Sequence, residues 1–290
     1  MTTESLSSAD PVWVTRRFDL ALDQPRVMGI VNVTPDSFSD GGRYALHDAA
    51  KARCERLLGE GADLLDIGGE STRPGAPRPS AEDELARVLP VLRYAVTLGC
   101  PVSVDTSAPQ VMQAALDLGV DIINDVRALR RPGTLACCAA DSRVGLCLMH
   151  MQGEPGNMQQ APAYADVAAE VASFLQGRLQ AVHAAGVALD RVVLDPGFGF
   201  GKTQAHNLTL AQNLLPLHRL GRPLLVGWSR KSVLGQLTGR AVDERLVPSV
   251  AAALAAAAQG ARIVRVHDVA ATVDALKVWA AIGPAPRPWS

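Results

Sequence analysis

Eight short apolar segments, each followed by a loop and a helical pattern, constrain the fold of this 290-residue chain more than any other feature. They are apolar throughout, which is typical of parallel strands covered on both faces. Eight such units in roughly 250 residues predict an α/β fold, the (β/α)8 TIM barrel. A doubly wound open sheet is the alternative. The segments are Val27–Val33, Leu64–Ile67, Pro101–Asp105, Asp121–Asn124, Val144–Met149, Arg191–Asp195, Pro223–Val226 and Arg262–Val266.

Helical patterns lie between and after these segments, and several of them end at a glycine that suits a helix C-cap. We expect helices at Ala45–Gly59, Ala81–Leu98, Pro109–Leu118, Thr134–Ala140, Tyr164–Ala185, Asn207–Leu217, Val247–Gln259 and Val269–Ile282.

The chain shows no internal repeat and no shift in composition that would mark a second domain. We expect one barrel domain over residues 26–283, an N-terminal tail with a hairpin over 1–25, and a C-terminal tail over 284–290. Residues 13–19 alternate in polarity, and Gln24–Pro25 predicts the turn of that hairpin.

The composition of the chain limits which binding partners and which cellular compartment we expect. A net charge of −1 gives no general affinity for nucleic acid or membrane, so we expect neither as a partner. The five cysteines are an odd set without C-x-x-C spacing, which argues against disulfides and structural zinc. A reducing, cytoplasmic location fits this pattern. Residues 1–11 do not resemble a signal peptide, and the apolar stretch Val247–Ala258 is too short to cross a bilayer.

Every apolar segment ends in, or is followed at once by, a residue able to do chemistry. One carboxylate after one strand is most often a helix cap. Eight such ends are better explained by an active site, because the carboxyl ends of barrel strands share one rim. In chain order these residues are Asn32; Asp66, Glu70, Ser71, Thr72 and Arg73; Asp105; Asn124 and Asp125; Met149 and His150; Asp195; Ser229, Arg230 and Lys231; then Arg265, His267 and Asp268.

The stretch Gly197–Thr203 superficially resembles a nucleotide-binding phosphate loop. The Walker pattern needs a glycine five residues before Gly201, and Pro196 occupies that position. ATP or GTP binding is therefore excluded by spacing. We expect the glycines to bend the backbone tightly and to present Phe198 or Phe200 to a ligand.

Eight segments of the chain, in the same order, resemble those of the dihydropteroate synthase family, the folate-pathway enzymes that sulfonamides inhibit. The resemblance implies a TIM barrel, a homodimer, Mg²⁺ dependence and the condensation of 6-hydroxymethyl-7,8-dihydropterin pyrophosphate with p-aminobenzoate. It implies a dissociative mechanism, in which pyrophosphate leaves before the amine attacks a pterin cation. The segments are Met28–Gly42, Asp66–Ala76, Ser103–Thr106, Ile123–Asp125, Leu148–Gly153, Leu194–Lys202, Gly227–Ser232 and Arg265–Asp268.

The resemblance also implies residue roles, with Asp105, Lys231, Arg265 and His267 as the catalytic set. It assigns pterin binding to Asp105, Asn124, Met149, Asp195 and Lys231. It assigns pyrophosphate binding to Asn32, Thr72, Arg73, Arg265 and His267, with Asn32 near the Mg²⁺. It assigns p-aminobenzoate binding to Phe38, Thr72, Pro74, Phe200, Lys231 and Ser232.

Two other functions stay open at this point. A pterin-binding methyltransferase on the same barrel would keep the pterin-reading residues, but it has no need for the pyrophosphate-binding residues Arg73, Arg265 and His267. A catalytically silent homologue that binds pterin or stabilises a partner would keep the sequence pattern without the reaction.

Overall fold

The computed structural model describes residues 11–34, 42–71, 75–76 and 78–283. Within these ranges the main sheet contains eight parallel strands, and each begins within two residues of a predicted segment. They are β3 (Arg26–Asn32), β4 (Leu64–Gly68), β5 (Val102–Asp105), β6 (Ile122–Asp125), β7 (Gly145–Met149), β8 (Val192–Asp195), β9 (Leu225–Val226) and β10 (Ile263–Val266).

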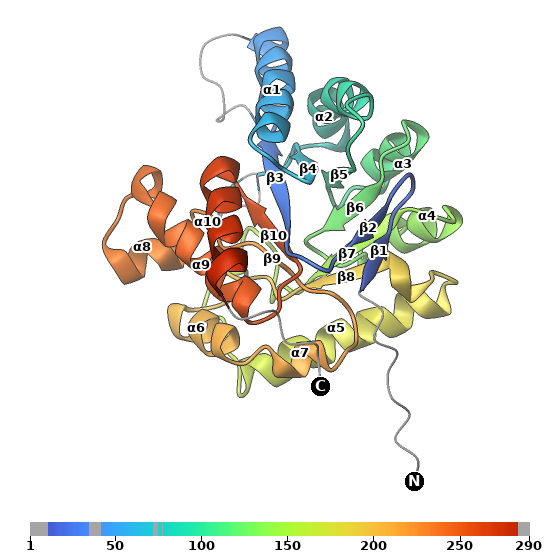
Figure 1. Cartoon of the computed structure of the whole chain (residues 1–290). Coiled ribbons are helices and arrows are strands. Elements are labelled where there is room, and N and C mark those ends of the chain that lie inside the picture. The colour runs from blue at the N-terminus through green and yellow to red at the C-terminus, as the bar shows by residue number, and fades with distance from the viewer. Residues whose placement is uncertain (1–10, 35–41, 72–74, 77, 284–290) are drawn as a thin grey trace.

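The strands form a ring. Hydrogen bonds link them in the order β8–β7–β6–β5–β4–β3–β10–β9, and a parallel bridge between Leu194 and Leu224 joins the two ends of the sheet. Figure 1 shows the last strand, β10, beside the first barrel strand, β3, with the helices around them. The ring confirms the TIM barrel and excludes the open sheet.

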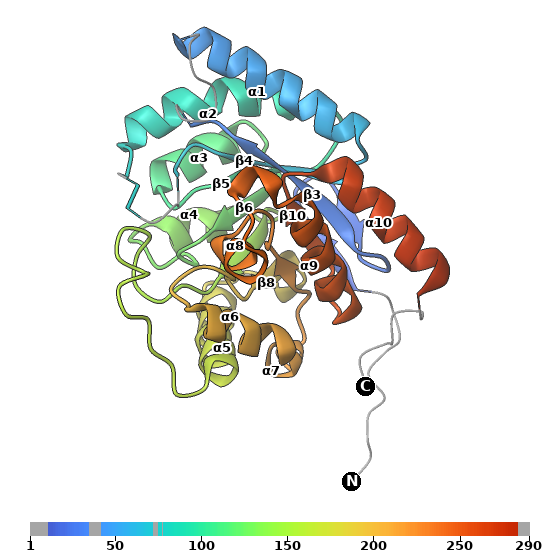
Figure 2. The same ribbon diagram turned by 90° about the vertical axis from the view of Figure 1, so that its left-hand side faces the viewer.

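The helices cover the outer face of the barrel, as the two views in Figures 1 and 2 show. The α-helices are α1 (Gly42–Gly59), α2 (Ala81–Ala95), α3 (Pro109–Asp117), α4 (Thr134–Ala140), α5 (Val167–Ala184), α6 (Gln204–Gln212), α7 (Leu215–His218), α8 (Ser232–Thr238), α9 (Leu246–Ala258) and α10 (Val269–Ile282). Within the described residues the chain also forms the short 3₁₀ helices η2 (Leu189–Arg191) and η3 (Val242–Glu244).

The single helix predicted over Asn207–Leu217 is wrong. The chain forms α6, which ends at Gln212, and a separate short helix, α7, which begins at Leu215. Pro216 lies in the first turn of α7. Proline lacks the backbone N–H and its ring clashes with the carbonyl four residues earlier, so α6 cannot continue through it.

An antiparallel hairpin precedes the barrel, formed by β1 (Val12–Val14) and β2 (Asp19–Ala21). The turn expected at Gln24–Pro25 is wrong, because the chain reverses between Thr15 and Phe18. There the backbone N–H and the hydroxyl of Thr15 both donate to the Phe18 carbonyl, at 2.8 and 2.6 Å. Arg17, in the turn, pairs with the buried carboxylate of Asp121 at 2.6 Å and so fixes the hairpin to the barrel.

The hairpin closes the amino-terminal end of the barrel. Trp13 is fully buried there, and its indole N–H donates to the Arg191 carbonyl at 2.9 Å. It belongs to a cluster of inward-facing residues near the amino ends of the strands. The barrel interior is thus apolar at this end. The cluster comprises Trp13, Leu22, Met28, Leu64, Ile122, Cys147, Val193, Leu225 and Ile263.

Alternation along the strands makes the opposite end of the interior polar. On β4, Leu64 belongs to this apolar cluster, and two residues later Asp66 lies on the same face. On β6, Ile122 is followed in the same way by Asn124. The inward-facing residues therefore change from hydrocarbon to carboxylate and amide within one step of the pleat, at the end where barrel active sites occur.

We predict that Trp13→Ala lowers the free energy of unfolding by about 3–5 kcal/mol, the usual cost of truncating a fully buried tryptophan. Chemical denaturation monitored by circular dichroism measures the change. Val12→Ala is the matched control: Val12 is the preceding residue of β1 and is 43% exposed, so it should cost about 0.5 kcal/mol or less. A loss below about 1 kcal/mol for Trp13→Ala would contradict the closing role of the hairpin.

Candidate active site

The carboxyl ends of the strands bring most of the predicted polar residues to one rim. Strand register places Asp105 beside Gly68 of β4 and Asn124 of β6. Asn32 ends β3, beside the same glycine. Asp195 pairs with Met149 further round the barrel. These residues come from segments up to 163 positions apart in the sequence, and the closed sheet alone brings them together.

Arg265 reaches across the rim from β10 and joins two carboxylates. Its Nε donates to Asp66 Oδ2 at 2.6 Å, and its Nη2 donates to Asp105 Oδ2 at 2.8 Å. The Asp66 side chain is fully buried and that of Asp105 largely so. Burial raises the pKa of Asp105 to about 8, with the Arg265 guanidinium opposing the shift and the Asp66 carboxylate adding to it.

Asn124 and Asp195 are both buried, and each has one oxygen without a partner among the described residues. The Asn124 amide donates from Nδ2 to Asp66 Oδ2 at 3.2 Å, which leaves its Oδ1 unused. Asp195 Oδ1 accepts from the Gly197 backbone N–H at 2.7 Å, which leaves its Oδ2 unused. Burial raises the pKa of Asp195. The rim thus presents acceptor oxygens to a ligand.

Lys231 supplies a cation at the same rim. It immediately precedes α8, and its Nζ lies 3.9 Å from the centroid of the Phe200 ring. No hydrogen bond from Nζ is found within the described part of the chain. Burial and the nearby Arg265 lower the pKa of Lys231 to about 8. A cation held by an aromatic face keeps its donors available for a ligand.

His267 follows β10, and its ring is held by Ser229. Ser229 Oγ accepts from the His267 backbone N–H at 3.1 Å and lies 3.0 Å from the ring Nδ1. Arg53 of α1 donates to the His267 carbonyl. Burial and the Arg265 guanidinium lower the pKa of His267 to about 3, so the imidazole is neutral at pH 7.

The loops that carry Lys231 and His267 are joined by a further ion pair. Arg230 adopts a left-handed conformation with φ of 59°, which is uncommon for a residue with a side chain. Its guanidinium contacts both carboxylate oxygens of Asp268, with Nε at 3.1 Å from Oδ2. The Ser249 hydroxyl accepts from the Arg230 backbone N–H at 3.0 Å. These contacts fix the backbone immediately before Lys231.

The glycine-rich stretch after β8 is built for close backbone approach. Gly197, Gly199 and Gly201 all have positive φ. A Cβ at Gly197 would lie 1.9 Å from the His150 carbonyl oxygen, and one at Gly199 would lie 3.0 Å from Cδ of Lys231. The loop therefore packs directly against two other rim segments, which only glycine permits.

This loop presents one of its two phenylalanines to the rim. Phe198 is fully buried and stacks on Trp228, with ring centroids 4.2 Å apart, which leaves Phe200 as the one of the two predicted phenylalanines that is placed for a ligand. Phe200 lies against Lys231 and belongs to an apolar cluster with Met149 and Met151. Lys202 is buried in the loop and donates to the Gly197 and Phe200 carbonyls at 2.9 and 3.1 Å. These hydrogen bonds from Lys202 stabilise the conformation of the loop.

Comparison with known proteins identifies the family. The model for "Pterin binding enzyme" matches residues 28–267. A dihydropteroate synthase from Neisseria meningitidis serogroup C is 55% identical over 94% of this chain and 98% of its own length. The Escherichia coli K12 enzyme is 50% identical over 89% of this chain and 92% of its own. The chain belongs to the dihydropteroate synthase family.

Solved structures of dihydropteroate synthases support the same family assignment. A Xanthomonas albilineans structure with 4-aminobenzoic acid has a TM-score of 0.89 and 52% identity, covering 94% of this chain and 98% of its own. A Yersinia pestis structure with a sulfonamide drug has a TM-score of 0.88 and 48% identity, covering 93% and 98%. The family relation excludes the methyltransferase alternative: the chain is a transferase of folate biosynthesis.

Some predicted residues of this synthase lie outside the described part of the chain. These are Phe38, Thr72, Arg73 and Pro74. Their assignment to pyrophosphate and p-aminobenzoate therefore stays a prediction from the family resemblance.

Sequence reasoning missed an ionic cluster beside the rim of the synthase. Arg127, which follows β6, is 5% exposed and pairs with Glu70 at 3.2 Å and with Glu154 at 2.6 Å. It joins the loops after β4, β6 and β7. Glu70 stood among the strand-end residues, but nothing in the sequence indicated its partner, since Arg127 lies 57 positions away.

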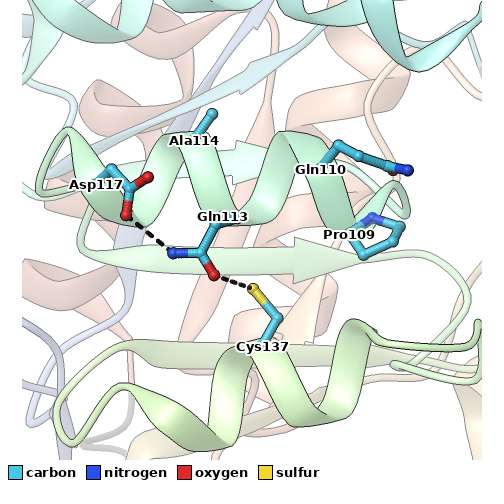
Figure 3. A pocket seen from close by; sticks show the side chains of 6 residues that line it. All are labelled: Pro109, Gln110, Gln113, Ala114, Asp117 and Cys137. Atoms are coloured by element: carbon cyan, nitrogen blue, oxygen red, sulfur yellow. Dashed lines mark hydrogen bonds between the residues drawn. The ribbon is translucent and has the colours of Figure 1, made fainter.

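A surface hollow lies outside the barrel, between α3 and α4 (Figure 3). It is lined by Pro109, Gln110, Gln113, Ala114, Asp117 and Cys137. All six belong to the outer helices and none to the rim, so the hollow is not part of the active site. Among the helices of the described residues, none has the length and apolar character needed to cross a bilayer.

The two shifted pKa values at the rim predict a bell-shaped pH profile of kcat/KM for dihydropteroate formation, with its maximum near pH 8. Activity rises with pH as Asp105 loses its proton, and it falls at higher pH as Lys231 loses its own. Steady-state assays from pH 6 to 10 measure the profile. Lys231→Arg keeps its charge above pH 10, so it should lose only the alkaline limb. An unchanged alkaline limb in that variant would contradict the assignment to Lys231.

Proposed function

We propose that the chain condenses 6-hydroxymethyl-7,8-dihydropterin pyrophosphate with p-aminobenzoate at this rim, giving 7,8-dihydropteroate and pyrophosphate. The observation that supports this proposal most is a set of buried and half-buried polar side chains with unused ligand-binding atoms at one end of the barrel: Asp105, Asn124, Asp195, Lys231 and Arg265. A related Xanthomonas albilineans structure described as a complex with 7,8-dihydropteroate supports the product.

The pterin ring matches the unused atoms of the rim. Its 2-amino-4-oxo edge has N–H donors beside a carbonyl acceptor. Asp195 Oδ2 accepts from the N–H groups, and the ammonium of Lys231 donates to the carbonyl. Charge-assisted hydrogen bonds of this kind contribute about 1.5–3 kcal/mol each. Met149, buried beside Phe200, packs against the ring.

The pyrophosphate is held by the remaining donors. Arg265 uses Nε and Nη2 for the two carboxylates, and Nη1 has no partner among the described residues, so it is available for an anion. In the tautomer in which the Ser229 hydroxyl donates to His267 Nδ1, the ring proton lies on Nε2 and is available to a phosphate oxygen. The family resemblance adds Thr72 and Arg73.

The aminobenzoate pocket lies on the Lys231 side of the rim. Phe200 offers the edge of an apolar cluster to the benzene ring. Ser232, exposed at the start of α8, is available for the carboxylate. The family resemblance completes this pocket with Phe38, Thr72 and Pro74.

The donor set near β3 fits Mg²⁺. Asn32 ends β3 with a half-exposed amide, and an amide oxygen is an acceptable magnesium ligand. Within the described residues no three His, Cys, Asp or Glu side chains gather as a metal site. Mg²⁺ does not require such a cage, because phosphate oxygens and water complete its shell. Bound there, it would neutralise charge on the leaving pyrophosphate.

The chemical step exchanges one bond for another. The bond between the exocyclic carbon and the pyrophosphate oxygen breaks, and the electron pair leaves with pyrophosphate. The positive charge left on the pterin is stabilised by the Asp105 carboxylate, which Arg265 holds in place. The p-aminobenzoate nitrogen then forms the new bond to carbon and loses a proton to solvent. No side chain becomes covalently attached.

We predict that Asp105→Asn and Asp195→Asn change different kinetic constants. Asp105→Asn removes the charge that stabilises the cation, so kcat should fall about 100-fold or more while KM for the pterin changes little. Asp195→Asn removes a ground-state contact to the pterin edge, so KM should rise with a smaller effect on kcat. Steady-state assays with both purified substrates measure these constants.

Asp195→Asn is the matched control, since both positions are buried carboxylates at the same rim. If Asp105→Asn lowers kcat and raises KM by similar factors, Asp105 is only a binding residue. A wild-type protein that forms no dihydropteroate would instead be the silent homologue.

We propose a homodimer that pairs through the outer faces of α9 and α10. Val247 on α9 is 74% exposed, and Val278 and Ile282 on α10 are 57% and 81% exposed. The two helices are neighbours (Figures 1 and 2). A set of large exposed apolar side chains on adjacent helices is typical of a protein interface.

We predict that the double variant Val247→Asp, Ile282→Asp is monomeric, because each substitution would place a charge in the dimer interface. Size-exclusion chromatography with light scattering gives the mass in solution. The control is Leu215→Asp on α7, a position 53% exposed that lies outside this surface. It should remain dimeric. A monomeric wild type would contradict the dimer, and a dimeric double variant would contradict the surface.

We propose a cytoplasmic location because the cysteine side chains are free thiols. All five cysteines are free, and four of them are buried. Free thiols are typical of proteins in a reducing compartment.

A further inference from the structure

Asp66 contacts two residues that the proposed function places against the substrate. Its Oδ2 accepts from Arg265 Nε at 2.6 Å and from Asn124 Nδ2 at 3.2 Å. The side chain is fully buried on β4, two residues before Gly68, which ends the strand beside Asp105. Asp66 is therefore not placed to bind substrate, but it is placed to position residues that do.

An amide side chain can turn either its NH₂ or its oxygen toward a neighbour, and the two orientations have nearly the same shape. Beside Asp66 they differ strongly in energy. Oδ2 already accepts from a guanidinium, so it is an acceptor toward Asn124 as well. The reversed amide would place two acceptor oxygens about 3.2 Å apart in a buried site. Only the orientation with Nδ2 toward Asp66 is favourable.

This orientation decides what Asn124 offers to a ligand. Its Oδ1 has no partner among the described residues and is left as an acceptor. An acceptor requires an N–H on the substrate. The 7,8-dihydropterin ring carries an N–H at position 8, and the fully oxidised pterin ring has a bare acceptor nitrogen there. The two rings are otherwise nearly identical in size and share the aminopyrimidine edge.

We propose that Asp66 is a positioning residue that fixes the Asn124 amide and thereby makes the site select the dihydropterin over the oxidised pterin. This inference rests on the proposed function, since it requires Asn124 to contact the pterin. It adds a specificity determinant that never touches the substrate. The N–H at position 8 donates to Asn124 Oδ1, and the oxidised ring meets an unpaired acceptor instead.

The probes are 6-hydroxymethyl-7,8-dihydropterin and 6-hydroxymethylpterin, titrated into the full-length protein by anaerobic calorimetry. Neither carries pyrophosphate, so the contact of Arg265 with that group does not enter. Wild type should bind the dihydropterin about tenfold more tightly, the usual consequence of replacing a hydrogen bond by an unpaired acceptor. Equal affinity in the wild type would overturn the proposal without any variant.

Asp66→Asn tests the positioning role. An asparagine at this position can donate or accept, so both orientations of Asn124 become populated, and the preference should fall to about twofold or less. Simple loosening of the site would weaken both probes equally and leave the ratio unchanged. A preserved ratio in folded D66N, checked by thermal unfolding, would overturn the role of Asp66.

Two further variants separate this inference from the proposed function. Asn124→Leu should lose dihydropterin affinity and the preference together. If it leaves dihydropterin affinity unchanged, the assignment of Asn124 to pterin binding is wrong. If it removes the preference while D66N keeps it, only the inference about Asp66 fails.

Ser103→Ala is the matched control. Ser103 is the β5 neighbour of Asp66 in the strand register, is equally buried, and has no hydrogen bond to Asn124. Its hydroxyl has no partner among the described residues, so its removal should leave both affinities and their ratio at the wild-type values.

Discussion

The active site depends on one guanidinium held between two buried carboxylates. Three carboxylates at or just below the rim, those of Asp66, Asp105 and Asp195, lie near two cations, Arg265 and Lys231. Without Arg265, Asp66 and Asp105 would both lose their ion-pair partner, which is costly for buried charges. When all three carboxylates are ionised, their surplus of one negative charge suits a substrate that becomes positive when pyrophosphate leaves. Barrel closure provides this arrangement, because it sets β10 beside β3 and brings its arginine within reach of β4 and β5.

The barrel could be predicted from the sequence because a strand buried on both faces has a distinctive composition. Each of the eight strands lies within two residues of a predicted segment at its start. The wrong predictions concern local features, such as the position of the hairpin turn, that depend on tertiary contacts. The hairpin turn forms at Thr15–Phe18 because Arg17 finds a buried partner in Asp121, 104 positions away. Composition alone favoured Gln24–Pro25, which instead leads into β3.

The sequence was sufficient to predict which residues share the rim, because the topology alone brings the strand ends together. What each residue does there depends on distances that no pattern encodes. Asp66 stood among the strand-end residues, yet its role follows from its two contacts, with residues 58 and 199 positions away. Phe198 and Phe200 occupy equivalent places in one glycine-rich stretch. Only the position of Trp228 decides that the first is buried in the core.

The hairpin that closes the barrel has a consequence for how the chain assembles during synthesis. Trp13 leaves the ribosome early, but the carbonyl that accepts its indole N–H belongs to a residue 178 positions later. Its neighbours Leu225 and Ile263 are made later still. The hairpin must therefore wait, with a large apolar ring exposed, until nearly the whole barrel has been translated. Such a delay makes the nascent chain a candidate for chaperone binding. It also makes docking of the hairpin a late step, after the closing strands have formed.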